Sequence, residues 1–396
     1  MAVFATARRC LLLVTVAVTV VSVVAVTPSS PGRPFRTLYA FGDSLTDTGN
    51  THSTTGPYSF GVSHPPYGAT FFHRPTNRYS DGRLVVDFLA LPSFLPPYLS
   101  TNATVNKASY SGVNFAVAGA TAIEYEFCRS NGPRFFARQN LSANITPQSI
   151  MTQLGWFDAH LRTRRAGSRG SNGSGKDRGV GDALFWVGEI GANDYGYSFM
   201  APDALPSERI RNMAIDRITT FLEALLKRGA KYVVVQGMPL TGCLPLAMTL
   251  SQPGDRDDFS CVASINRQNL DHNHHLQAVL HRLRRSHPDA IIAYADYHAA
   301  HLAVVRSPAK YGFAEPFKAC CGTGGGAYNF EIFSTCGSPE VATACAHPAR
   351  YVNWDGVHMT EAMHKVVARM FFHDATGAYC RPTFGSMLAA RKGHAK

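Results

Sequence analysis

The sequence predicts an α/β fold in which a mostly parallel, five-stranded sheet carries helices on both faces. Five short apolar segments recur along the 396-residue chain, and near-continuous apolar runs are typical of strands buried inside a parallel sheet. Longer segments with a helical spacing of apolar side chains alternate with these strands, which favours crossover connections between parallel neighbours. Neither an internal repeat nor an interdomain linker is evident, so residues 28–396 are expected to form one domain.

The expected strands are apolar runs that stop at a glycine or at a polar turn. In chain order they cover residues 37–41, 112–119, 183–188, 231–236 and 290–295. The expected helices cover 147–165, 207–228 and 261–286, with a short one closing at 87–90 and a last one opened by Thr360, whose hydroxyl is a plausible N-cap. Proline-rich and aromatic stretches between 51 and 110 are expected to form loops beside the functional site.

The first 27 residues are expected to be a secretory signal peptide. Arg8 and Arg9 precede an apolar run from Cys10 to Val26, which is the pattern of such a signal. Because the run is near the lower length limit for spanning a bilayer, an uncleaved signal-anchor is the alternative. The body of the protein is expected to enter the secretory lumen in either case.

The cysteines and glycosylation sequons agree with that route. The even set of eight that remains without Cys10 suggests disulfides whose connectivity the spacing leaves open: Cys128, Cys243, Cys261, Cys320, Cys321, Cys336, Cys345 and Cys380. No paired Cys-x-x-Cys occurs, which argues against a zinc site. Acceptor sequons for N-glycosylation stand at Asn102, Asn140, Asn144 and Asn172.

The chain is basic, with a formal net charge of +11. Such a field favours acidic partners such as a uronate-bearing polysaccharide, although the same charge can serve solubility alone. The densest basic tract, residues 160–178, lacks aromatic residues for base stacking. A nucleic-acid partner is therefore not expected.

Polar residues with catalytic potential stand where the expected strands end. Ser44 follows the first strand, at the sheet edge where open α/β folds place their chemistry, and it can act as a nucleophile. Asp355 precedes His358 by three residues, so its carboxylate can orient the imidazole as a general base. The backbone N–H groups of Ser44 and Gly119 and the side-chain amide of Asn193 could then stabilise an oxyanion.

Two other segments resemble functional motifs. Asp271 and His274 repeat the Asp-x-x-His spacing, but they lie within an expected helix whose polar face, including His275 and His281, is expected to be solvated; metal binding there is the alternative. Residues 320–326 resemble a phosphate-binding loop but lack its Lys-Ser/Thr ending. A loop tied by disulfides is expected instead.

Four ordered blocks give the chain its resemblance to a known family. These are Gly42-Asp-Ser-Leu45, Gly112-Val-Asn-Phe-Ala116 with Gly119, Gly191-Ala-Asn-Asp194 and Asp355-Gly-Val-His358, with Ser80-Asp-Gly-Arg83, Leu95-Pro-Pro-Tyr98, Cys320-Cys-Gly322 and Tyr328-Asn329 between them. Over about residues 37–380 the chain resembles the plant GDSL esterase/lipases of the SGNH hydrolase superfamily.

That resemblance implies a flavodoxin-like, three-layer α/β/α fold and hydrolysis of carboxylic esters without a cofactor or metal. It assigns Ser44 as nucleophile, His358 as base, Asp355 as the orienting carboxylate, and Ser44, Gly119 and Asn193 as the oxyanion hole. Met359 departs from the family pattern, in which proline often follows the histidine, and we expect only a local change in chain direction there.

The resemblance leaves the substrate open. A basic, glycosylated and secreted protein would meet acidic, acetylated wall polymers, so deacetylation of xylan or pectin in the cell wall is the expected reaction. A GDSL acyltransferase, a phenolic or lipid esterase and a non-catalytic carbohydrate-binding protein are the alternatives. A membrane partner is expected only if the N-terminal segment is an uncleaved anchor in the Golgi membrane, and the sequence does not indicate the oligomeric state.

Overall fold

The computed structural model describes residues 35–51, 61–89, 93–100, 112–124, 146–168, 180–199 and 205–394. The expected signal peptide, Cys128 and the four sequons at Asn102, Asn140, Asn144 and Asn172 lie outside these ranges. Phe35–Lys396 forms one compact unit. Among the described residues, no helix has the length and apolar character needed to cross a membrane.

The central sheet has six strands in the order β2-β1-β3-β4-β5-β8. They are β1 (Leu38–Phe41), β2 (Val113–Asn114), β3 (Leu184–Val187), β4 (Tyr232–Gln236), β5 (Ile291–Ala295) and β8 (Cys380–Arg381). The five predicted strands are confirmed, and all five are parallel. The sixth, β8, pairs antiparallel with β5 and was not predicted, because two residues carry no periodicity.

Helices alternate with these strands, as the sequence predicts. The α-helices are α3 (Ile150–Ser168), α4 (Ala192–Phe199), α5 (Ser207–Lys227), α6 (Pro245–Leu250), α7 (Ala263–Ser286), α8 (Tyr297–Arg306), α9 (Glu361–His373) and α10 (Phe384–His394). Short 3₁₀ turns cover Val85–Phe88, Thr241–Cys243, Pro308–Tyr311, Pro339–Val341 and Pro348–Arg350. A small second sheet pairs β6 (Glu315–Ala319) with β7 (Tyr351–Asn353).

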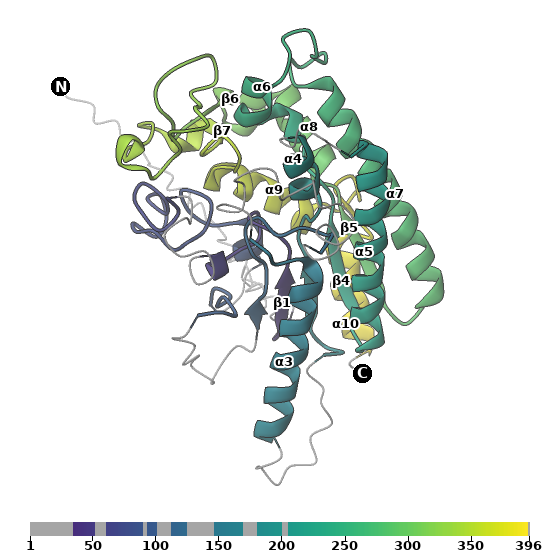
Figure 1. Ribbon diagram of the computed structural model, residues 1–396. Coiled ribbons are helices and arrows are strands. Elements are labelled where there is room, and N and C mark those ends of the chain that lie inside the picture. The colour runs from purple at the N-terminus through teal and green to yellow at the C-terminus, as the bar shows by residue number, and fades with distance from the viewer. Residues whose placement is uncertain are drawn as a thin grey trace, which may run out of the picture. The chain divides into compact units, whose positions relative to one another are not determined.

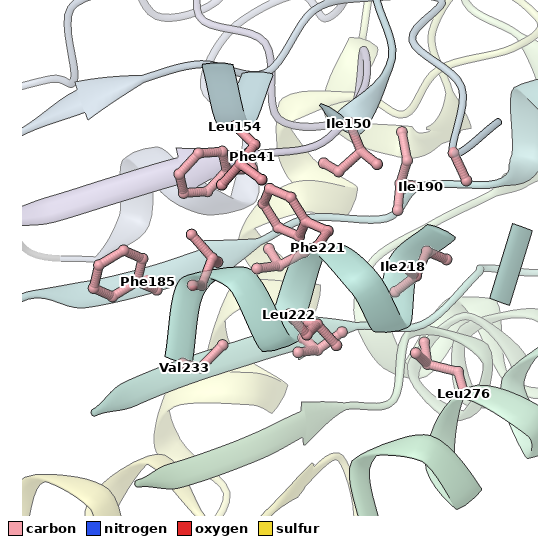
Figure 2. Close-up of a cluster of buried hydrophobic side chains, with 14 of the residues drawn as sticks. Phe41, Ile150, Leu154, Phe185, Ile190, Ile218, Phe221, Leu222, Val233 and Leu276 are labelled. Atoms are coloured by element: carbon pink, nitrogen blue, oxygen red, sulfur yellow. The ribbon is translucent and has the colours of Figure 1, made fainter. Parts of the chain in front are cut away.

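One face of the sheet packs against α3, α5 and α7 (Figure 1). Alternate residues of each strand point to this side, as the pleat requires. Figure 2 shows Phe41, Phe185 and Val233 from three neighbouring strands meeting Phe221 and Leu222 of α5. This apolar layer holds β1 and β3 in position. Their carboxyl ends lead to Ser44 and to the segment before Asn193.

The opposite face packs against α8, α9 and α10. Trp186 of β3 is fully buried there, with its ring 6.3 Å from that of Phe371 in α9. Thr360 accepts a hydrogen bond from Met363 N and thus caps α9, as the sequence predicts. Helices on both faces make the three-layer α/β/α arrangement that was expected.

Disulfides tie two segments outside the central sheet. Cys243 pairs with Cys261, Cys320 with Cys345, and Cys321 with Cys336. The last two bonds confirm that residues 320–326 belong to a disulfide-tied loop. Cys380 is a buried free thiol in this structure.

Candidate active site

Asp355 and His358 face each other in the loop between β7 and α9. His358 Nδ1 lies 2.7 Å from Asp355 Oδ2, and Asp355 Oδ1 accepts hydrogen bonds from the backbone N–H groups of Val357 and His358. Burial by itself raises the pKa of Asp355, but the charge and hydrogen bonds of His358 outweigh it and lower the pKa below its usual value. The carboxylate therefore stays ionised and directs the other ring nitrogen, Nε2, away from itself.

Two tyrosines from the proline-rich segment support this pair. Tyr67 donates a hydrogen bond of 2.8 Å to Asp355 Oδ2, and burial raises the pKa of Tyr67 well above its usual value, so it remains a donor. The Tyr79 ring lies 4.7 Å from the His358 ring, centroid to centroid. Sequence reasoning placed these loops beside the site, but it did not assign either tyrosine a role.

The segment Ser80–Arg83 fastens the start of α9. Asp81 Oδ1 accepts a 2.6 Å hydrogen bond from Glu361 N, and the Glu361 carboxylate accepts bonds from the backbone and guanidinium of Arg83. Met359 is buried in the adjoining apolar cluster. Met359, the residue that departs from the family pattern, is therefore packed in the core. The start of α9 is held separately, by the polar contacts of Asp81 and Arg83 with Glu361.

Ser44 lies in a tight turn that follows β1. The carbonyl of Asp43 accepts hydrogen bonds from Thr46 N (3.1 Å) and Asp47 N (2.9 Å). Gly42 precedes the turn with φ +137°, a conformation that L side chains rarely adopt. The Gln153 amide of α3 holds Gly42 from both sides, accepting from its N–H and donating to its carbonyl.

The buried carboxylate of Asp47 joins this turn to the segment that contains Gly119. Its Oδ1 accepts bonds from Gly49 N and Asn50 N, and its Oδ2 accepts a 2.9 Å bond from Ala118 N. Gly119 comes next in the chain, with φ +78°. The strand predicted to reach Gly119 ends at Asn114. Phe115 N still bonds to the Ala40 carbonyl of β1, but the later N–H groups of Val117 and Ala118 bind the Gly42 carbonyl and the Asp47 carboxylate instead of continuing the ladder.

Helix α4 brings Asn193 to the same place. Asn193 Nδ2 donates to Asp43 Oδ2 (3.2 Å) and to the carbonyl of Ala120 (3.0 Å). Tyr197, one turn further along α4, donates a 3.0 Å bond to the carbonyl of Gly119. These contacts bring three predicted site segments together.

The neighbouring Asp194 anchors the start of α4 to the loop after Gly119. Its carboxylate accepts bonds from Ala122 N (2.8 Å) and Ile123 N (3.0 Å), while burial raises its pKa to about 7. Asp194 is therefore fully committed to backbone groups. Its role in the geometry is to hold the chain on either side of the Asn193 amide.

Two backbone donors remain for a ligand at this point. Among the described residues, none accepts a hydrogen bond from the N–H of Ser44 or of Gly119. Ser44 is 8% exposed and His358 also 8%. Ser44 Oγ and His358 are not hydrogen-bonded to each other in this structure; such bonds often tighten only when substrate is present.

Burial raises the pKa of Asp43, next to Ser44, and the charge of His358 offsets part of that rise, so the histidine lies close enough to act on the Ser44 turn. The histidine and the Ser44 turn therefore share one site. The arrangement combines a serine, an oriented histidine and unpaired N–H donors, which together can carry out acyl transfer.

The second Asp-x-x-His segment lies elsewhere, on α7. Asp271, His274, His275 and His281 are exposed, as predicted, and among the described residues no three metal-ligating side chains converge. His272, on the opposite face of α7, is buried with its pKa lowered to about 3 by burial, and its Nδ1 lies 3.1 Å from the Tyr195 hydroxyl oxygen.

Comparisons with known proteins agree with the sequence resemblance. The model of the family described as GDSL-like Lipase/Acylhydrolase matches residues 38–371. A GDSL esterase/lipase of Arabidopsis thaliana is 51% identical over 90% of this chain and 90% of its own length. Acetylajmalan esterase 2 of Rauvolfia serpentina is 35% identical over 86% of this chain and 90% of its own.

A solved structure, phospholipase A1 of Streptomyces albidoflavus NA297, is 14% identical with a TM-score of 0.28, covering 75% of this chain and 91% of that one. A likeness of this extent carries no argument about the present site.

The two tyrosines of α4 allow a matched test of the Gly119 contact. Tyr197→Phe removes the hydrogen bond to the Gly119 carbonyl, so we expect kcat for an ester substrate to fall about tenfold, the equivalent of roughly 1.4 kcal/mol. Tyr195→Phe removes a hydroxyl that faces His272 instead and should leave kcat unchanged in the folded protein. Steady-state kinetics of both variants decide the matter, and equal kcat values would contradict this role of Tyr197.

Proposed function

We propose, from the premise that this chain belongs to the GDSL-like lipase/acylhydrolase family and is a carboxylic ester hydrolase, that it cleaves esters with Ser44, His358 and Asp355. The observation that best supports the proposal is the bond between Asp355 and the Nδ1 atom of His358. It leaves Nε2 as the nitrogen that can take a proton from a serine. No other Asp-x-x-His pair in the described residues is buried in this way.

In the proposed reaction, Ser44 Oγ attacks the acyl carbon and its proton passes to His358 Nε2. The N–H groups of Ser44 and Gly119 and the Asn193 amide bind the oxyanion that forms. His358 then returns the proton to the departing alkoxide, which leaves as an alcohol. The acyl group remains on Ser44 as an acyl-serine. Water, deprotonated by the same histidine, cleaves the acyl-serine and regenerates Ser44.

The proposed roles separate His358 from the exposed His274. His358→Ala and Ser44→Ala should each lower kcat by about 10⁶, since triad members act as a unit. His274→Ala should keep wild-type kinetics because its side chain lies on the exposed face of α7. The measurement is turnover of p-nitrophenyl acetate by enzyme freed of contaminating esterase; a Ser44→Ala variant with a tenth of wild-type activity would refute the assignment.

For the substrate, we propose an acetyl ester of an acidic wall polysaccharide. The net charge, +11 for the full chain and +9 without Arg8 and Arg9 of the proposed signal, favours an anionic polymer. One relative is named as an esterase of acetylajmalan, which is consistent with a short acyl group. Among the aromatic residues of the proline-rich segment, Tyr67 and Tyr79 are buried and not available to sugars, whereas Phe71 and Phe94 are 39% and 42% exposed.

The phenylalanine pair is where a sugar ring could pack. Phe71 and Phe94 stack edge to face, 5.9 Å apart, and the Arg83 guanidinium lies 3.8 Å from the Phe71 centroid. Because Arg83 is ion-paired with Glu361, what the phenylalanine pair offers a sugar is apolar ring surface rather than a free cation. Acyl transfer to an alcohol, and hydrolysis of phenolic or lipid esters, are compatible with the same triad and are the competing substrates and reactions.

A substrate panel tests this proposal. At equal enzyme concentration, acetate release from acetylated pectin or xylan should exceed turnover of choline, feruloyl and long-chain esters. The excess on pectin should shrink as salt rises towards ~1 M, because added ions screen the attraction. If a phenolic or lipid ester is turned over at least ten times faster than every acetylated polymer, the polysaccharide proposal is wrong. Adding an alcohol acceptor distinguishes acyl transfer from hydrolysis.

We also propose that residues 1–27 are removed and that the glycosylated protein is exported to the cell wall. The arginine pair followed by an apolar run supports this. N-terminal sequencing of protein purified from wall extracts should begin after residue 27. A chain that keeps Arg8 and Arg9 and resists carbonate extraction from Golgi membranes would instead establish the anchored form.

A further inference from the structure

A pair of buried carboxyl groups lies beneath the Ser44 turn. Asp43 directly precedes Ser44, and Glu189 follows β3; their exposed fractions are 3% and 1%. The two carboxyl groups hold adjacent residues, Glu189 through Ala192 N and Asp43 through the Asn193 amide, and each shifts the pKa of the other through a side-chain contact. Two carboxylates are both acceptors, so a hydrogen bond between them requires that one carries a proton.

The remaining contacts indicate which group holds it. Asp43 Oδ1 accepts from Leu45 N at 3.0 Å and Oδ2 accepts from Asn193 Nδ2, as an ionised carboxylate would. Glu189 Oε1 accepts from Ala192 N at 2.9 Å. Glu189 Oε2 is buried and has no donor among the described residues. It is therefore the oxygen free to carry the proton toward Asp43.

The electrostatics of the pair agree with this assignment. Burial raises the pKa of both groups, and it raises that of Glu189 well above its usual value, with the Asp43 charge adding to the effect. Two like charges in contact cannot both be kept in a buried site. The pair accordingly holds one proton, which the contacts place on Glu189.

We infer that Glu189 is a positioning residue for the Asn193 amide and acts through Asp43. As a neutral acid, it donates to Asp43 and so fixes the carboxylate that holds the Asn193 side chain. Through Oε1 it also holds Ala192, the residue before Asn193. The inference rests on the proposed roles of Ser44 and Asn193 in the reaction.

The proton on Glu189 also bears on the charge next to the oxyanion. Both hydrogens of the Asn193 amide are occupied in this structure, by Asp43 and by the Ala120 carbonyl. An oxyanion must share one of them, and it does so more easily when Asp43 already accepts a bond from Glu189. Loss of the proton would place a second negative charge beside the oxyanion and oppose its formation.

A pH dependence follows, and its sign is set by the raised pKa of Glu189. The proton is present at low pH and is lost as pH rises, so kcat should decline at alkaline pH. The other titratable groups that act on the pair come from α4, α8 and the loop before α9: Asp194, Tyr195, Tyr197, Tyr297 and His358.

Two substitutions of Glu189 test the inference. Glu189→Gln keeps a donor toward Asp43 and an acceptor for Ala192 but cannot ionise. It should retain kcat near neutral pH and lose the alkaline decline of the wild type. Glu189→Leu removes both contacts and should lower kcat about tenfold or more with KM unchanged, less than the roughly 10²–10³ expected for Asn193→Ala.

The substrate is p-nitrophenyl acetate, with circular dichroism at each pH to exclude unfolding. Asp158→Asn, which breaks the ion pair with Arg228 between α3 and α5, is the control for loss of a structural carboxylate and should change melting but not the pH profile. If Glu189→Gln keeps the wild-type alkaline decline, or Glu189→Leu keeps wild-type kcat, the inference is wrong.

If Glu189→Leu does not fold, the profile of Glu189→Gln alone decides. The proposed reaction fails separately, through an active Ser44→Ala variant. An inactive Ser44→Ala beside a fully active Glu189→Leu would overturn only the role of Glu189.

Discussion

The buried carboxylate of Asp47 is the constraint on which the rest of the site depends. It accepts backbone hydrogen bonds from its own turn and from Ala118, more than sixty residues later in the sequence. Neither loop has a regular ladder to satisfy these N–H groups, and an unpaired buried N–H is costly. One side chain therefore fixes the separation between the Ser44 turn and Gly119. It does so without using the N–H groups of Ser44 and Gly119, which remain available to a ligand.

The site contains several buried acids that, like Asp47, accept hydrogen bonds from irregular chain segments. Each of them has a different role. Asp47 joins two loops, Asp194 holds α4, Asp355 orients His358, and Asp43 with Glu189 forms a pair that shares a proton. Burying carboxylates costs free energy unless their oxygens are hydrogen-bonded. Backbone N–H groups meet most of that requirement here, so the acids stabilise irregular chain segments rather than the sheet or its helices.

The sequence allowed the sheet and the segments of the site to be predicted, because both depend on local signals. The β-branched run before Gln236 and the apolar run before Gly42 read directly as strands. Helix α4 was missed because its eight residues are mostly polar or aromatic and include Gly196. The parts played by Tyr67 and Glu189 depend on partners 288 and 146 positions away in the chain, and no spacing rule reaches that far.

The disulfide-tied loop has a consequence for where this enzyme can mature. Phe330, inside the loop closed by Cys321 and Cys336, packs so closely on Gly356 that a Cβ there would lie 2.2 Å from the ring. The backbone beside Asp355 is thus shaped by a covering that is covalently closed only where thiols are oxidised. Chains made in a reducing cytosol would have the same Asp355 and His358 but an open loop beside them. Oxidation of these cysteines would then be a maturation step that follows folding of the sheet and its helices and shapes the loop that carries Asp355 and His358.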